Sequence, residues 1–99
     1  MNITNILDAD KTILALAGRL DSGTAPKLLA TLMAEIDNHN QILLDFSDVA
    51  YVSSAGLRVL LQGHKATAGA GGALTLCNVG ADVMDVLEAT GFAVVLNII

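Results

Sequence analysis

Apolar residues recur along the chain with two different periods. Short apolar or alternating runs, typical of strands, predict β-structure at residues 3–7, 11–17, 42–46, 73–79 and 93–98. Apolar residues spaced three and four apart, typical of a buried helix face, predict helices at about residues 25–38, 54–66 and 81–89. Segments rich in turn-forming residues separate these elements, at 8–11, 18–23, 47–53 and 67–72. The predicted order is therefore β-β-α-β-α-β-α-β.

Capping residues mark the ends of the predicted helices. The order of strands and helices along the chain indicates the fold class. Thr24 is the expected N-cap of the first helix, and Pro26 lies in its first turn, where a missing N–H costs no hydrogen bond. Gly91 is expected just beyond the last helix. Alternating strands and helices imply parallel pairing through right-handed crossovers, and the opening pair adds an antiparallel hairpin. We expect one α/β domain over residues 1–99, with a mixed, mostly parallel sheet and about three to four helices packed on it.

Composition limits the classes to which the chain can belong. Hydrophobic residues make up 54% of 99 residues, yet no uncharged apolar stretch approaches the ~20 residues that span a bilayer. The net charge of −5 argues against binding to nucleic acids or anionic membranes, which depends on clustered Lys and Arg. The first twelve residues do not resemble a signal peptide, and Cys77 is the single cysteine. Both features favour a cytoplasmic location.

Motifs for nucleotide and metal binding are absent from the sequence. The glycine-rich run at 69–72 lacks the spacing of a dinucleotide fingerprint and precedes a predicted strand, so it indicates a turn. Cys77, His39 and His64 are widely separated and do not form the three- or four-ligand pattern of a zinc site. Cys77 is expected to be a small buried residue within a strand. We predict no metal and no cofactor.

The acidic pairs in the sequence match neither a calcium-binding loop nor a catalytic site. Asp8 and Asp10 are spaced as at the start of a calcium loop, but the glycine and distal glutamate of that motif are missing, so they indicate a turn. Asp45 and Asp48 flank the end of a predicted strand without a nucleophile and histidine nearby. We therefore predict that the chain is not an enzyme.

Ser53 and Ser54 stand at the start of the second predicted helix. A serine there is most often an N-cap that accepts a hydrogen bond from a free backbone N–H. The same free N–H groups and the helix dipole also stabilise an anion, so a phosphoryl group on such a serine would be held without unfolding the domain. Gly56 would leave the backbone bare there, which allows a partner to approach closely. On the residues alone, both interpretations stay open.

Three segments resemble a known family. Residues 45–61, DFSDVAYVSSAGLRVLL, resemble the signature of STAS domains and are most similar to that of bacterial anti-sigma factor antagonists. Residues 16–21, LAGRLD, resemble the family's Gly-x-Leu-Asp loop before its first long helix. Residues 86–92, VLEATGF, resemble its last helix and the turn that follows. The resemblance covers nearly the whole chain and implies the STAS fold.

The resemblance implies a mechanism called partner switching. The unphosphorylated protein is expected to bind an anti-sigma factor, a serine kinase with a histidine-kinase-like ATPase fold, and so to release a sigma factor. The kinase then phosphorylates the antagonist, which dissociates, and a PP2C-type phosphatase resets it. By position in the motif, Ser54 matches the phosphoacceptor, with Ser53 as the alternative.

The resemblance also implies a set of partner-binding residues. They are Asp21, Ser53, Ser54, Gly56, Leu57 and Arg58. Two positions depart from the family pattern, since many members carry Asp at Ser53 and Gly is frequent at Arg58. Arg58 is expected either to bind the phosphate or to contact the partner.

Two alternatives belong to other classes. The chain could be a STAS subunit that is not phosphorylated and serves a membrane complex, such as a lipid-transport ABC system. It could instead be a sensor that binds a nucleotide or a small anion at the helix start. Co-purification with a transporter would favour the first, and micromolar nucleotide binding would favour the second.

Overall fold

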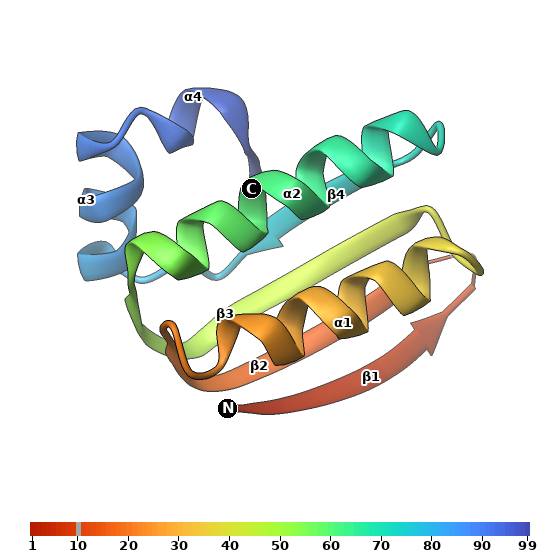
Figure 1. The fold of residues 1–99 in the computed structure, drawn as a ribbon, viewed down its shortest axis with the longest axis horizontal. Helices are drawn as coiled ribbons and strands as arrows, with labels where there is room; N and C mark the ends of the chain where they lie inside the picture. Colours follow the sequence, from red (N-terminus) through yellow and green to blue (C-terminus); the bar gives the residue numbers. More distant parts are fainter. Residues whose placement is uncertain (10) are drawn as a thin grey trace.

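The computed structural model describes residues 1–9 and 11–99, and Figure 1 shows how their helices and strands are arranged. Five strands are present in this part of the chain: β1 (Asn2–Asp8), β2 (Lys11–Leu20), β3 (Gln41–Val52), β4 (Ala73–Cys77) and β5 (Asn97–Ile98). The same residues form four helices: α1 (Ala25–Ile36), α2 (Ser54–Gly69), α3 (Ala81–Ala89) and the single turn α4 (Phe92–Val95). No helix among the described residues is long and apolar enough to span a membrane.

The strands form one sheet in the order β1-β2-β3-β4-β5. β1 and β2 pair antiparallel, with Ile6 opposite Ile13, whereas every later neighbour pairs in parallel. The predicted hairpin, the parallel crossovers and the mixed sheet are therefore confirmed. The predicted hairpin turn includes Asp10, which lies outside the described residues. Its neighbour Ala9 adopts a φ of 56°.

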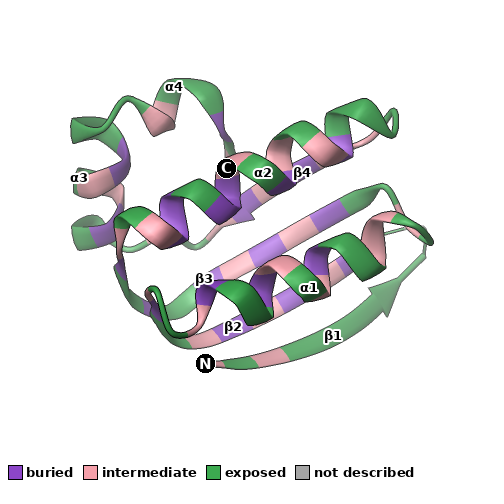
Figure 2. Ribbon diagram, in the orientation of Figure 1, coloured by how far each residue is buried: buried purple, intermediate pink, exposed green. Residues whose placement is uncertain are grey.

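The helices bury one face of the sheet. In β2, β3 and β4, buried residues alternate with half-buried ones, and the buried set packs under the helices. Figure 2 shows this alternation along β3, behind the inward faces of α1 and α2. Leu44 and Leu60 are fully buried, and Val83 and Leu87 of α3 belong to the same core. The core is aliphatic except for Phe46.

Residues 18–20 and 47–52, which were predicted to be loop, are strand. β2 continues to Leu20 and β3 continues to Val52, because the two strands keep pairing in parallel beyond the expected ends. Their register shifts twice on the way, between Ala15 and Ala17 and again between Gly18 and Arg19. These irregularities admit Gly18 at a φ of 115° and interrupt the apolar alternation. The alternation therefore predicted strands that were too short.

The predicted strand at 93–98 is mostly wrong. Gly91, at a φ of 82°, ends the segment after α3 as expected, but residues 92–95 then form α4 and only two residues pair with β4. The chain must return from the end of α3 to the sheet edge, and Leu96 is the residue it buries on the way. Val94, in contrast, is 90% exposed, so the apolar run that indicated a strand is not a buried strand.

Smaller differences have local causes. β4 ends at Cys77, earlier than predicted, because Asn78 adopts a left-handed φ of 56°. Cys77 is half-buried and not fully buried, since its side chain lies on the sheet face that the helices leave uncovered. α2 continues to Gly69, and the hydroxyl of Thr67 inside it is buried and donates to the Gly63 carbonyl at 2.9 Å.

Candidate functional site

The carboxyl ends of β2 and β3 lie beside the N-termini of α1 and α2. Figure 1 shows all four ends gathered on one side of the molecule. The Ser53 N–H donates to the Leu20 carbonyl at 2.9 Å, which joins the start of α2 directly to the end of β2. Parallel α/β sheets place their binding loops at this edge, because every strand delivers its following loop there. The predicted site residues are on this edge.

Ser53 is the N-cap of α2. Its backbone is extended, with φ −90° and ψ 174°, and its hydroxyl oxygen accepts a hydrogen bond from the Gly56 N–H at 3.3 Å. The Ser53 carbonyl accepts the first helical bond, from the Leu57 N–H at 2.9 Å. Of the two serines expected at the start of the helix, Ser53 is therefore the one that caps it. Because Ser53 caps the helix, the hydroxyl of Ser54 is not needed as a cap.

Ser54 is the first residue of α2 and its side chain is exposed. Within residues 1–9 and 11–99, its hydroxyl makes no hydrogen bond, in contrast to that of Ser53. The first N–H groups of a helix have no partner within the helix, and they carry the positive end of its dipole. An anionic group attached to Ser54 would therefore lie in solvent next to a favourable partial charge.

Gly56 does not offer a bare backbone to a partner, and that interpretation is wrong. A Cβ at this position would lie 2.7 Å from Leu20 Cγ and 2.9 Å from the Leu20 carbonyl oxygen. The glycine is buried and lets the first turn of α2 sit directly on the end of β2. Leu57, only 5% exposed, packs into the core as well. These two residues position the site and contribute little surface to it.

Asp21 begins the loop between β2 and α1. Its Oδ1 accepts hydrogen bonds from the N–H groups of Gly23 at 3.0 Å and Thr24 at 3.2 Å. Partial desolvation raises the pKa of this carboxyl, but these hydrogen bonds, the Thr24 hydroxyl and the Arg19 guanidinium outweigh it, so the pKa is held below its ordinary value. Thr24 occupies the predicted N-cap position of α1, but its hydroxyl makes no capping bond. It donates to the Arg19 carbonyl at 2.7 Å instead.

A stacked pair beside this loop was not predicted from sequence. The Arg19 guanidinium carbon lies 4.0 Å from the centre of the Tyr51 ring, and Arg19 Nε lies 3.7 Å from Asp21 Oδ2. Arg19 and Tyr51 are partners in the β2–β3 register, at a point where loops were expected, so their proximity had no visible signal. The pair gives the site an exposed cation next to Asp21.

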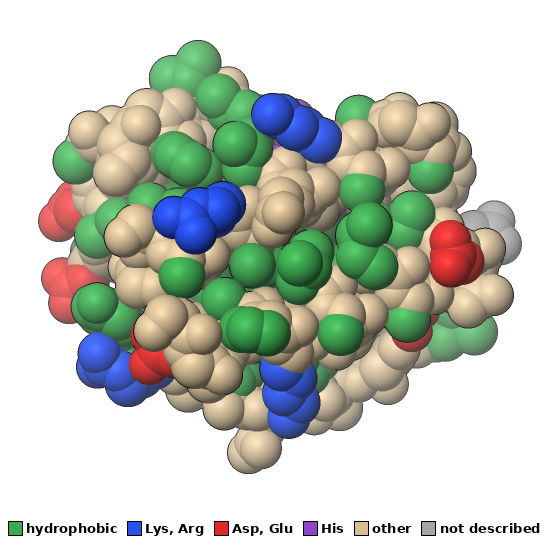
Figure 3. All heavy atoms as spheres, in the orientation of Figure 1, with side chains coloured by type: hydrophobic (Ala, Val, Ile, Leu, Met, Phe, Trp, Pro, Cys, Tyr) green, Lys and Arg blue, Asp and Glu red, His purple; other side chains and the backbone are tan. Residues whose placement is uncertain are grey.

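Arg58 lies one turn into α2, at a groove between α1 and α2. The groove has a volume of about 440 Å³ and is lined by Ser22, Ala25, Pro26, Leu29, Ala55, Arg58, Val59 and Gln62. Figure 3, which views the molecule from this side, shows hydrophobic side chains gathered between the two helices, with Lys and Arg side chains around them. Arg58 is the single charged residue that lines the groove.

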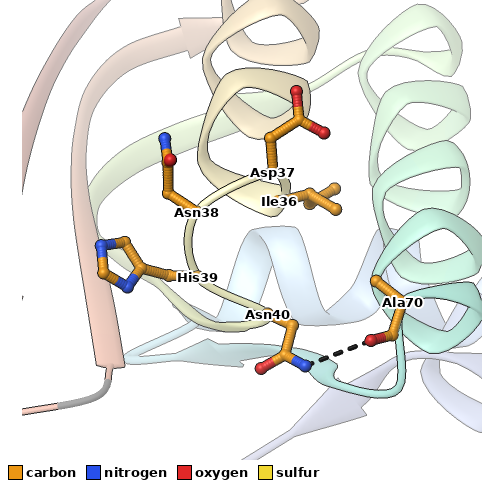
Figure 4. Close-up of a pocket in the computed structure, with 6 residues that line it drawn as sticks. All are labelled: Ile36, Asp37, Asn38, His39, Asn40 and Ala70. Atoms are coloured by element: carbon orange, nitrogen blue, oxygen red, sulfur yellow. Dashed lines mark hydrogen bonds between the residues drawn. The ribbon is translucent and has the colours of Figure 1, made fainter.

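A second hollow does not direct its ionisable side chains towards one another. A hollow of about 360 Å³ at the opposite ends of α1 and α2 is lined by Asp37, Asn38 and His39 among others. Figure 4 shows that the Asp37 carboxylate and the His39 ring point away from each other. Among the residues that line this hollow, Asn40 Nδ2 donates a hydrogen bond to the Ala70 carbonyl oxygen at 3.2 Å. The described part of the chain contains no group of three or more metal-ligating side chains.

Of the two acids that the sequence places near Phe46, Asp45 lies within β3 and is held by hydrogen bonds, whereas Asp48 is exposed. The Ser47 N–H and the Asn78 amide, at 2.9 Å and 3.1 Å, donate to Asp45 Oδ1 and hold the pKa of that carboxyl below its ordinary value. Burial, with a smaller contribution from the Asp45 charge, raises the pKa of the Cys77 thiol. A thiol held in its neutral form is a poor nucleophile.

Comparison with known proteins gives matches that extend over most of the chain. The model of the STAS domain family matches residues 2–99. The candidate anti-sigma factor antagonist BtrV of Bordetella bronchiseptica is 38% identical over 81 residues, which cover 81% of this chain and 70% of that protein.

Solved structures share the fold. A candidate anti-sigma factor antagonist from Thermotoga maritima superimposes with a TM-score of 0.91 at 24% identity, over 97% of this chain and 84% of that one. The phosphorylated form of SpoIIAA from Bacillus superimposes with a TM-score of 0.76 at 16% identity, over 99% and 91% of the two chains. At these identities the likeness shows a common fold.

Proposed function

The chain belongs to the STAS domain family, and we propose that it is an anti-sigma factor antagonist whose binding is switched off by phosphorylation of Ser54. One observation carries the proposal. Ser54 presents an exposed hydroxyl at the first position of α2, while the neighbouring Ser53 makes the capping hydrogen bond. The resemblance of residues 45–61 to the family signature and the relationship to BtrV support the same role.

The modification fits the local structure. The hydroxyl oxygen of Ser54 would take the γ-phosphoryl group of ATP, with release of ADP and of the hydroxyl proton. The new group would add about −1.5 to −2 charge at one exposed point. Nothing in the fold needs to open, because Ser54 is exposed and its hydroxyl holds no bond within the described residues. SpoIIAA, which shares the fold, is known in unphosphorylated and phosphorylated forms.

The partner would be an anti-sigma factor that is also a serine kinase. Asp21, Ser54 and Arg58 would provide direct contacts, and Ser53, Gly56 and Leu57 would hold the start of α2 in place. A PP2C-type phosphatase would reverse the modification. In this role the chain acts as a ligand and a substrate of other proteins and is not itself an enzyme.

Intact-mass analysis tests the modification. The chain is incubated with ATP and each histidine-kinase-like serine kinase of its own genome. We expect the mass of one phosphate with one kinase, lost in Ser54→Ala and kept in Ser53→Ala. Full-rate phosphorylation of Ser54→Ala would make Ser54 the wrong acceptor, and no phosphorylation by any of these kinases would contradict the proposed switch.

Calorimetric titration of the same kinase tests the consequence. A phosphoryl dianion in an interface that accepts a neutral serine costs at least about 1.4 kcal/mol, which is tenfold in affinity. The phosphorylated chain should therefore bind at least about tenfold more weakly than the unmodified chain. Equal affinities would show that phosphorylation does not control binding.

A further inference from the structure

The groove between α1 and α2 begins beside the proposed phosphorylation site. Ala55, which follows Ser54, lines the groove together with Arg58. The rest of the lining is apolar or uncharged, and Pro26 and Leu29 face it from α1. A surface of this kind accepts an apolar segment of a partner. The groove and the phosphoacceptor therefore meet at the first turn of α2.

Arg58 forms no ion pair with any residue that the structure describes. Among residues 1–9 and 11–99, the single ion pair joins Arg19 and Asp21. Arg58 is exposed, and the chain as a whole carries a net charge of −5. An unpaired guanidinium at the edge of an apolar groove is complementary to an apolar segment that carries a carboxylate, since this pairing is commonly bidentate.

The spacing of Ser54 and Arg58 also brings them together. They are four residues apart in α2, so they lie on one face of the helix, separated by about 6 Å along its axis. Side chains on a helix lean towards its N-terminus, which points Arg58 back over the turn that contains Ser54. A guanidinium on a flexible stem can therefore reach a phosphoryl group on Ser54.

We propose that Arg58 transmits the modification state of Ser54 to the α1–α2 groove. In the unmodified chain, Arg58 binds a carboxylate on an apolar segment of the anti-sigma factor that occupies the groove. In the phosphorylated chain, the phosphoryl group binds Arg58 within α2 and withdraws it from the partner. The inference rests on the proposed function and deepens it, because Arg58 binds the carboxylate of the partner in one state and the phosphoryl group in the other.

The intramolecular pair is tested without any kinase. Phosphoserine is placed at position 54 by codon-directed incorporation, and its phosphorus resonance is followed by NMR against pH. The helix dipole acts on every variant alike, so a difference between variants isolates Arg58. We expect Arg58→Gln to raise the apparent second pKa of the phosphoserine by about 0.2 to 0.4, from the strength of an exposed i,i+4 pair. Lys65→Gln, an exposed cation further along α2, should leave it unchanged.

The same titration in Arg58→Lys separates charge from geometry. A lysine keeps the charge but loses the paired donors, so its titration should fall between those of the wild type and Arg58→Gln. Identical titration curves for the wild type and Arg58→Gln would overturn the proposal. So would an equal displacement in Lys65→Gln, because the effect would then come from the overall charge.

The partner half is tested with the kinase that phosphorylates Ser54. Arg58→Gln should weaken binding of the unmodified chain about tenfold and reduce the loss of affinity caused by phosphorylation, whereas Lys65→Gln should change neither. Unchanged binding of Arg58→Gln would overturn the proposed contact. If no kinase modifies Ser54, the proposed function fails, and the phosphorus titration still decides whether Arg58 pairs with the phosphate.

Discussion

Gly56→Ala should destabilise the protein although it places a better helix former in a helix. The added methyl carbon would lie 2.7 Å from Leu20 Cγ and 2.9 Å from the Leu20 carbonyl oxygen, with Val52 Cγ1 at 3.1 Å. Carbon atoms pack at about 3.5–4.0 Å, so each contact is too short by several tenths of an ångström or more. Leu20 is fully buried, and its carbonyl already accepts from the Ser53 N–H, so it has little freedom to move.

The magnitude follows from two opposing effects. Inserting a methyl group into a packed site costs about 1–3 kcal/mol, and the close approach to the backbone of Leu20 puts this site in the upper part of that range, at about 2–3 kcal/mol. The gain in helix propensity from Gly to Ala is at most about 1 kcal/mol. The free energy of unfolding should therefore fall by about 1–2 kcal/mol, and the Tm by roughly 5–15 °C for a domain of this size.

Urea unfolding at 25 °C, followed by circular dichroism, measures the change, and Gly69→Ala is the matched control. Gly69 also lies in α2, but a Cβ there meets no atom within 4 Å. The control should keep its stability or gain up to about 1 kcal/mol. If Gly56→Ala were as stable as the wild type while the control behaved as expected, the first turn of α2 would not sit on the end of β2 as described.

The remaining predictions concern the cap and the loop acid. Ser53→Ala should lower the free energy of unfolding by about 1 kcal/mol through loss of the N-cap, whereas Ser54→Ala should change it by no more than about 0.5 kcal/mol. Equal losses in the two variants, measured by urea unfolding, would contradict this division of roles. The lowered pKa of Asp21 contributes stability that is present at neutral pH and is lost as the pH falls below about 4. The loss of stability between pH 7 and pH 3, measured by urea unfolding, should thus be smaller in Asp21→Asn than in the wild type, and equal losses would contradict this role of Asp21.

Much of the fold could be predicted because local pattern and final packing agree. The helix at Ala81–Ala89 has its predicted bounds, since its apolar spacing and the glycine after it point to the same structure. The ends of β2 and β3 could not be predicted, because only their pairing with each other shows that residues 18–20 and 47–52 are strand. The Arg19–Tyr51 stack could not be predicted for the same reason, because it depends on the shifted register between β2 and β3.

Parts of the site followed from sequence for a related reason. A helix start is a local feature, so Ser53 and Ser54 could be placed from neighbouring residues alone. Gly56 was placed correctly but explained wrongly, because its neighbour Leu20 is distant in sequence. The α1–α2 groove was missed altogether, since it is formed by two helices whose outer faces show no separate pattern.

The neutral cap at Ser53 affects how sharp the proposed switch can be. An Asp at this position, the residue expected from the resemblance to the family, would place a negative charge at the helix start before any modification. Here the cap is a hydroxyl, so the unmodified helix start carries no side-chain charge from Ser53 or Ser54. Phosphorylation would change that charge from zero to about −1.5 to −2. With no carboxylate at the cap to compete for Arg58, the guanidinium would have one strong acceptor in each state, the partner before modification and the phosphoryl group after it.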